Sequence, residues 1–315
     1  MHVESTVLER ARGFEVSAAR FSRLALAAVA ALWLIVATGA AVRLTASGLG
    51  CEHWPGCTKG NPFPAKDYHA FIEFGNRMLG TVPILLTLVV SVAAVFVRGL
   101  PSWTTWLALA VFLGTLAQAP LGYLTVHFDL NPLLVISHLL LALLVLGGAV
   151  VVALEALGLE RGRAAPLVPR EVRRLGLVFA ASALALVVSG TFVTAAGPHS
   201  GGSDIRRLGT LSTALYVHVR VTALFGCVFL FLLGYLAARR ERSPLLFRAS
   251  LGLLGLILVQ MAIGEIQYRT HLPWPLVLVH VAVAGAVWAG TVALATLFWR
   301  PLAAFARDPT IKPLD

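Results

Sequence analysis

The sequence predicts an all-α integral membrane protein in which eight transmembrane helices form two pseudo-symmetric, parallel four-helix bundles, with the N- and C-termini in the cytoplasm. Three observations predict this fold class: long uncharged stretches, an uneven distribution of Lys and Arg, and an internal repeat. Of the 315 residues, 58% are apolar and 13% are charged. Ordinary soluble domains of this length do not have such a composition, so we expect most of the chain to lie in a lipid bilayer.

Eight stretches without Asp, Glu, Lys or Arg predict the helices in chain order. They run over residues 24–42, 78–97, 99–128, 130–154, 175–203, 221–238, 249–264 and 270–299. A helix that crosses a bilayer needs about 17 to 25 apolar residues. The shorter stretches reach this length through their neighbours, and we therefore expect eight transmembrane helices.

The Lys and Arg residues indicate how the helices are oriented. With the N-terminus placed in the cytoplasm, 17 of the 25 Lys and Arg residues fall on the cytoplasmic side and six on the outer side. This asymmetry is the positive-inside pattern of membrane proteins. The net charge of +10 therefore reflects topology, and we expect no nucleic-acid partner. No cleavable signal peptide is evident, so we expect the first helix to remain as an anchor in the plasma membrane.

An internal repeat with an offset of 142 residues relates the two halves of the chain. Gln118 precedes His138 by 20 residues, and Gln260 precedes His280 by the same distance. Each pair spans one helix, a short outer loop with proline, and the next helix. Self-similarity of this kind is typical of folds built from repeated units.

Two further correspondences extend the repeat. The same offset aligns Asn76 with His218, each in the second helix of its half. The segment GAAVRLTAS at 39–47 also resembles GTFVTAAGP at 190–198. Because each half has an even number of helices, the two repeats have the same orientation in the membrane.

The repeat divides the chain into three parts. Residues 1–160 form an N-terminal four-helix half, residues 161–174 form a basic cytoplasmic linker, and residues 175–315 form a C-terminal four-helix half.

The segment GLGCEHWPGC at 48–57 places two cysteines in the first outer loop. On the outer side of a membrane, oxidising conditions allow disulfides to persist, and we expect a disulfide between Cys51 and Cys57. A metal site with His53 and a pair of free or redox-active thiols are the alternatives. Cys227 lies in the middle of a predicted helix, and we expect it to pack in the core.

Three histidines lie at lipid depth, where polar side chains mark function. His138 and His280 follow outer prolines by six and five residues, and His218 also enters its helix from the outside. His218 and His280 come from the second and fourth helices of their half, so the two imidazoles can face each other across a haem. A hydrogen-bonded structural role is the alternative for each histidine.

The first half has Asn76 where a partner for His138 is expected. One face of the same helix carries His69, Glu73 and Asn76, at i, i+4 and i+7, followed by Arg77. His69 is a candidate ligand for a shallower or tilted haem. Glu73 either forms a structural pair with Arg77 or acts beside a substrate as a proton acceptor or cation-stabilising carboxylate.

Other polar residues lie in the predicted outer loops, where ordinary interfacial or solvated roles compete with functional ones. We expect interfacial roles for His53, His127, His199 and His271. Four arginines could hold haem propionates or could be solvated loop charges. They are Arg43, Arg206, Arg207 and Arg269.

Five segments together resemble haem A synthase, the membrane enzyme of cytochrome oxidase assembly. They are TASGLGCEHWPGC (45–57), HAFIEFGNR (69–77), ISHLLLA (136–142), HVRVTAL (218–224) and VHVAVAG (279–285). The resemblance covers essentially the whole chain. It implies two four-helix halves, each with a haem site near the outer face.

The resemblance also implies roles for individual residues. His218 and His280 would be the axial ligands of haem b, and His138 would ligate the iron of the substrate, haem O. Glu73 and Asn76 would be the catalytic positions, although the family usually has a histidine at the place of Asn76. Either His69 substitutes for that histidine, or the iron keeps only His138.

The implied reaction oxidises the C8 methyl group of haem O to a formyl group in two steps, through an alcohol and a hydrated aldehyde. The implied partners are haem O synthase, which supplies the substrate, and an unidentified electron acceptor. A homo-oligomer is left open, because lipid-facing and protein-facing apolar surfaces look alike from composition. A di-haem cytochrome b that transfers electrons between quinol and an outer acceptor is the main alternative. A transporter built from parallel repeats is a third reading, which the clustering of histidines toward one face disfavours.

Overall fold

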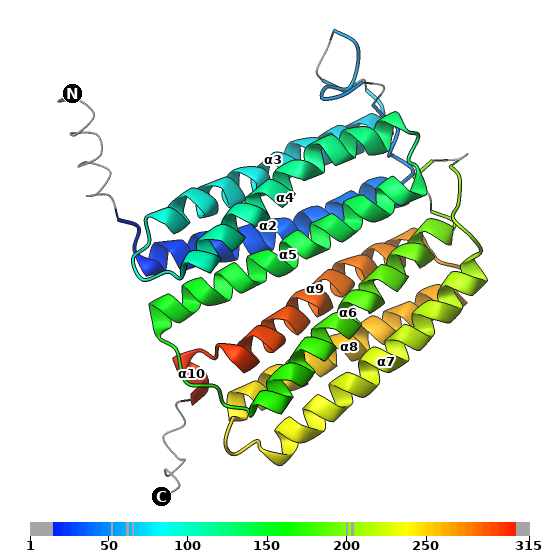
Figure 1. Ribbon diagram of the computed structural model, residues 1–315. Coiled ribbons are helices and arrows are strands. Elements are labelled where there is room, and N and C mark those ends of the chain that lie inside the picture. The colour runs from blue at the N-terminus through cyan, green and yellow to red at the C-terminus, as the bar shows by residue number, and fades with distance from the viewer. Residues whose placement is uncertain are drawn as a thin grey trace, which may run out of the picture.

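The computed structural model describes residues 15–306, except 52, 61–62, 65, 200 and 203–204. Eight long helices and one short helix make up this part of the chain (Figure 1). They are α2 (Ala18–Leu44), α3 (Tyr68–Val95), α4 (Ser102–His127), α5 (Pro132–Arg161), α6 (Arg170–Ala196), α7 (Leu211–Ala238), α8 (Pro244–Arg269), α9 (Trp274–Trp299) and α10 (Ala303–Ala306). The eight long helices are each apolar enough and long enough to cross a membrane, which confirms the predicted number. The described residues contain no β-strand.

The helices fall into two groups of four. In the first group, α2 and α4 each pack against both α3 and α5; in the second, α6 and α8 each pack against both α7 and α9. Among the described residues, the diagonal helices α3 and α5 do not pack directly on each other, and neither do α7 and α9. Each diagonal pair therefore faces across the middle of its group. The two groups lie side by side in Figure 1.

Two turns at the histidine end of the helices have the same backbone. Asp129 and Leu130, between α4 and α5, have positive φ angles of 49° and 56°, and His271 and Leu272, between α8 and α9, have φ angles of 62° and 60°. Such angles are uncommon outside glycine, so their recurrence is a specific feature of both turns. The N–H groups of Leu130 and Leu272 also donate to carbonyl groups five residues earlier. Each turn starts the next helix at the same distance before its histidine.

Helix α9 joins the groups by packing against α2 and α5. The indole N–H of Trp33 on α2 donates to the carbonyl of Ala282 at 2.8 Å. The indole N–H of Trp288 on α9 donates to the carbonyl of Leu143 at 2.6 Å. Trp288 lies on Gly147, where an added Cβ would come within 3.2 Å of the ring. The absence of a side chain there lets α5 and α9 approach closely.

A buried ionic cluster connects the opposite ends of the same helices. Glu155 on α5 is 2% exposed and pairs with Arg163 at 2.7 Å and with Arg300 at 2.6 Å. Arg163 also donates to the carbonyls of Leu154 and Arg300. Burial lowers the pKa of Arg163 from its ordinary value, and the Glu155 carboxylate opposes that shift. An isolated β-bridge between Arg163 and Leu302 continues the connection.

Packing is dense at one end and sparse at the other in four of the helices, α4, α7, α8 and α9. Helix α7 has no buried residue before Phe225, and α9 has none before Gly285. Helix α8 has none after Ile257, and α4 has none after Thr115. The histidines predicted to be functional lie at the sparsely packed end.

Helix α5 continues to Arg161 and α6 begins at Arg170, so both ends of the segment 161–174 lie in helices. The structure corrects one expectation. Cys227 has no disulfide partner but is exposed, so its predicted place in the core is wrong. A small apolar side chain needs no protein cover where lipid is its surrounding.

The ionic cluster generates a stability prediction. Glu155→Ala should lower the free energy of unfolding by about 3 kcal/mol, because it leaves two arginines without their shared carboxylate. Thermal unfolding of the purified protein in detergent checks this. Glu265→Ala, which removes the surface partner of Arg269, is the control and should have an effect below about 1 kcal/mol. Equal effects of the two substitutions would contradict the role given to Glu155.

Candidate functional site

His138 on α5 and His280 on α9 have matching surroundings. Gln118 donates its side-chain N–H to the carbonyl of His138 at 3.2 Å, and Gln260 donates to the carbonyl of His280 at 3.1 Å. A Cβ built four residues beyond each glutamine would touch the histidine ring, at 3.5 Å for Gly122 and 3.1 Å for Gly264. The Nδ1 atoms of both rings are buried without a hydrogen-bond partner in the described structure. The carbonyl of each histidine is therefore held by a glutamine side chain, and its ring lies against a glycine, both on the preceding helix.

His218 on α7 is oriented by α6. Its Nδ1 shares a hydrogen bond of 2.8 Å with the hydroxyl of Ser189. A Cβ on Gly190 would lie 3.3 Å from Cε1 of His218. A hydrogen bond at one ring nitrogen fixes the ring and leaves the other nitrogen to bind a metal. His218 and His280 come from the diagonal helices of their group, α7 and α9.

Asn76 occupies the corresponding place in the first group. Its side-chain oxygen accepts a hydrogen bond of 2.9 Å from the hydroxyl of Thr38 on α2. Thr38 and Gly39 correspond to Ser189 and Gly190 in the repeat. A Cβ built on Gly39 would have no atom within 4 Å. The hydroxyl partner and the space for a ring are both present, although residue 76 is not a histidine.

His69 lies in the first turn of α3 and is exposed. Its Nδ1 shares a hydrogen bond of 3.0 Å with the hydroxyl of Ser47. This serine–histidine contact resembles the one between Ser189 and His218. The ring therefore has one nitrogen fixed and one free, as a metal ligand requires.

Glu73 lies in a cluster with the loop between α2 and α3. It forms the ion pair with Arg77 that was one of its two interpretations, and the backbone N–H of Cys51 donates to the second carboxylate oxygen of Glu73 at 2.8 Å. Cys51 and Cys57 form a disulfide, as expected, which excludes a metal site made of their thiolates. Among the described residues, no group of three His, Cys, Asp or Glu side chains could hold a metal ion.

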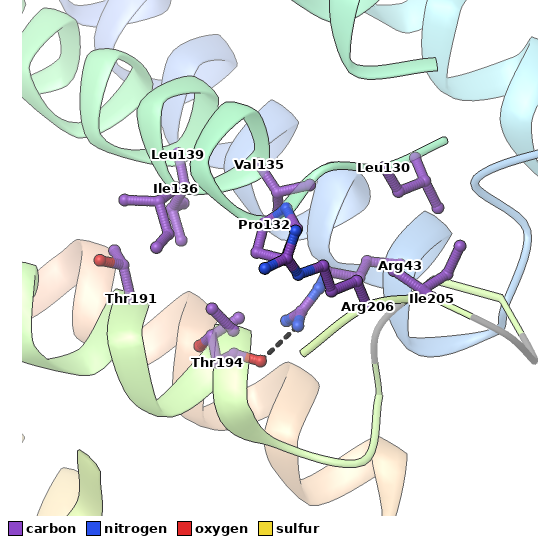
Figure 2. Close-up of a pocket in the computed structure, with 11 residues that line it drawn as sticks. Arg43, Leu130, Pro132, Val135, Ile136, Leu139, Thr191, Thr194, Ile205 and Arg206 are labelled. Atoms are coloured by element: carbon purple, nitrogen blue, oxygen red, sulfur yellow. Dashed lines mark hydrogen bonds between the residues drawn. The ribbon is translucent and has the colours of Figure 1, made fainter. Parts of the chain in front are cut away.

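Two outer arginines line a small cavity between the groups. Figure 2 shows Arg43 from α2 and Arg206 from the loop before α7 pointing into the space between α5 and α6. Arg43 donates to the carbonyl of Thr194, and its Nε is buried without a partner. By contrast, Arg269 is paired with Glu265 on the surface of α8 at 2.5 Å. Of the four arginines considered as anion partners, Arg43 and Arg206 are thus the two that the fold brings together.

The hydroxyl partners of the site were absent from the sequence prediction. Ser47, Thr38 and Ser189 lie on a different helix or loop from the residues that they contact. Ser and Thr are too common in membrane helices to stand out. The similarity between residues 39–47 and 190–198 is the one sequence feature that points to these hydroxyl groups, because Thr38 and Ser189 immediately precede the two segments.

Comparison with known proteins identifies the family. A model of the cytochrome oxidase assembly protein family matches residues 22–292. The chain belongs to this family. Similar proteins named heme A synthase include one from Geobacillus thermodenitrificans, 34% identical over 111 residues, and one from Shewanella oneidensis, 25% identical over 299 residues. The first match covers 34% of this chain and 33% of the relative, and the second covers 78% and 87%. These matches confirm the resemblance to the haem A synthase family inferred from the sequence.

The contact between the disulfide loop and α3 generates a second prediction. A Cβ on Gly50 would lie 2.5 Å from the backbone of His69, which cannot move out of the way as a side chain could. Gly50→Ala should therefore displace the loop, lower the free energy of unfolding by about 1 to 3 kcal/mol, and leave more free thiol at Cys51 and Cys57. Thermal unfolding and quantitative thiol labelling check this.

Gly75→Ala on α3 is the matched control, because its Cβ would meet no atom within 4 Å. It should leave labelling unchanged. If Gly50→Ala and Gly75→Ala gave the same thermal stability and the same thiol labelling, Gly50 would not be packed against the backbone of His69 as the structure has it.

Proposed function

We propose that this protein is a haem A synthase that oxidises the C8 methyl group of haem O to a formyl group in two successive steps. The observation that carries the proposal is the pair of imidazoles on the diagonal helices α7 and α9, repeated on α5 but replaced by Asn76 on α3. Family membership and the names of the similar proteins support the same activity. The distribution of Lys and Arg supports a multi-pass protein of the plasma membrane with both sites toward the outer side.

The second group fits haem b with His218 and His280 as axial ligands. Ser189 occupies Nδ1 of His218, and Nδ1 of His280 is buried and unpartnered. Glycines lie against both rings, and the surrounding ends of α7, α8 and α9 carry no buried residues. When bound, haem b supplies one-electron redox chemistry. The chain holds the two rings and excludes competing ligands from the site.

The first group fits the substrate, haem O. His138 would bind the iron from α5, and His69 is the candidate for the opposite side because Ser47 fixes its Nδ1. Asn76 is held by Thr38 at the position where the second group has His218, which would hold haem b there. A site for a substrate has to release its product, so an asymmetric ligand set suits it better than two matched histidines.

Glu73 is the residue proposed to act on the reacting methyl group. Its carboxylate is held by Arg77 and by the N–H of Cys51, and it is buried. A fixed negative charge stabilises positive charge that develops at a neighbouring carbon, and a carboxylate oxygen can also accept a proton. The ion pair and the N–H of Cys51 hold the group in place without occupying all of its lone pairs.

A di-haem cytochrome b that transfers electrons between quinol and an outer acceptor is the second candidate. The contact between Ser47 and His69 favours it, because this histidine would give the first group two ligands as well. The two functions also need different partners. The synthase needs a supply of haem O, which haem O synthase would provide, and an electron acceptor; a second copy of the chain is a further partner to be tested.

The main test is to identify the haems that the protein holds after expression together with haem O synthase. Extraction, chromatography and mass detection should find haem A with the unchanged protein. Glu73→Ala should lower its yield by about 100-fold or more, because the carboxylate is lost from the reaction. Only haem B and unmodified haem O in folded protein, with an electron acceptor present, would favour the cytochrome instead.

A second test concerns residue 76. Asn76→His should add an axial ligand to the first site, because Thr38 offers a hydrogen-bond partner and Gly39 leaves room for the ring. With His218 and His280 replaced by alanine, the visible and paramagnetic resonance spectra report on the first site alone. We expect a shift toward a six-coordinate, low-spin spectrum. An unchanged spectrum would show that His69 already supplies the second ligand or that residue 76 does not face the iron.

A further inference from the structure

Arg77 connects Glu73 to the disulfide loop. One guanidinium nitrogen donates to the carbonyls of His53 and Gly56, at 2.7 Å each. The other nitrogen donates to the Glu73 carboxylate. Both carbonyls belong to the ring of residues that the disulfide closes between Cys51 and Cys57. One side chain of α3 thus binds the loop backbone and the carboxylate together.

The carboxylate completes the connection from its other oxygen, which accepts from the N–H of Cys51 at 2.8 Å. The carboxylate and the two cysteines are shielded from solvent, with Glu73 4% exposed, Cys51 2% and Cys57 1%, whereas His53 is exposed. Water cannot readily replace hydrogen bonds at buried positions, so their loss leaves unsatisfied groups. The loop and the carboxylate therefore hold each other in place.

We propose that Arg77 is a positioning residue that couples the Glu73 carboxylate to the Cys51–Cys57 disulfide, so that the thiol–disulfide state of the loop determines how firmly Glu73 is held. The role of Glu73 toward substrate rests on the proposed function, whereas the coupling itself does not. Coupling between two sites is reciprocal. If the disulfide fixes Glu73, then Glu73 and Arg77 stabilise the disulfide against reduction.

The chemical step is thiol–disulfide exchange with a dithiol. Two electrons and two protons pass from the dithiol to the Cys51–Cys57 bond, which breaks to give two thiols, while the dithiol becomes a cyclic disulfide. The open loop no longer constrains the carbonyls of His53 and Gly56 to face Arg77. The N–H of Cys51 is released from the same constraint.

The experiment measures the reduction equilibrium of the full chain in lipid nanodiscs, without haem O. Protein with Cys227→Ala, which leaves only Cys51 and Cys57, is equilibrated with mixtures of reduced and oxidised dithiothreitol. Alkylation and mass spectrometry then give the reduced fraction. Arg77→Leu and Glu73→Gln should each raise the equilibrium constant for reduction by about fivefold or more.

Two further variants make the result decisive. Arg77→Lys keeps the charge but loses the planar fork of donors, and it should lie between the unchanged protein and Arg77→Leu. Glu265→Gln alters the surface ion pair of α8 and should leave the constant unchanged. Because lysine retains the charge, Arg77→Lys decides the outcome if Arg77→Leu does not fold.

Equal equilibrium constants for the unchanged protein, Arg77→Lys and Glu73→Gln would overturn the coupling. The measurement needs no turnover, so it separates this inference from the proposed function. If the coupling is found but no haem A is formed, Arg77 remains a positioning residue and the proposed synthase activity is wrong. If haem A is formed but no coupling is found, the synthase activity stands and the positioning role of Arg77 is wrong.

Discussion

The need to satisfy every backbone hydrogen bond within the bilayer constrains the rest of the structure. In hydrocarbon, a spanning segment that is not part of a closed barrel has to be helical, so each functional side chain is presented from a helix at a chosen depth. The paired left-handed residues at 129–130 and 271–272 set that depth for His138 and His280. Helix packing then sets the direction, because diagonal helices face one another across their group.

The second constraint is that the helices are packed unevenly along their length. In α4, α7, α8 and α9 the buried side chains lie away from the histidine end. At the level of this packing, Phe179, Phe225 and Phe229 stack on one another. The apolar cluster there includes residues of both groups, and it supplies the close packing that holds them together. The other ends of the helices are consequently free to be shaped by ligands and loops. The close-packed apolar cluster and the proposed haem sites thus lie at different depths along the same helices.

The number of helices, the disulfide and the ion pair between Glu73 and Arg77 could be predicted, because each depends on composition or on residues close in the chain. The hydroxyl contacts of the histidines could not, since they depend on which helices become neighbours. The hydrogen bonds from Arg77 to the carbonyls of the loop could not be predicted, because every residue has a backbone carbonyl and the sequence does not show which ones a side chain reaches. Cys227 was misplaced because apolar character does not distinguish a lipid-facing side chain from a buried one.

The cluster around Glu155 has a consequence for biosynthesis. Its carboxylate can take Arg163 soon after α5 has been made, because the two residues are close in the chain. Arg300 arrives only when α9, the last long helix that the structure describes, has been inserted. This contact therefore forms only after α6, α7, α8 and α9 have been made. Before α9 is in place, Glu155 and Arg163 form a neutral pair on their own, and only the addition of Arg300 ties α5 to the end of α9.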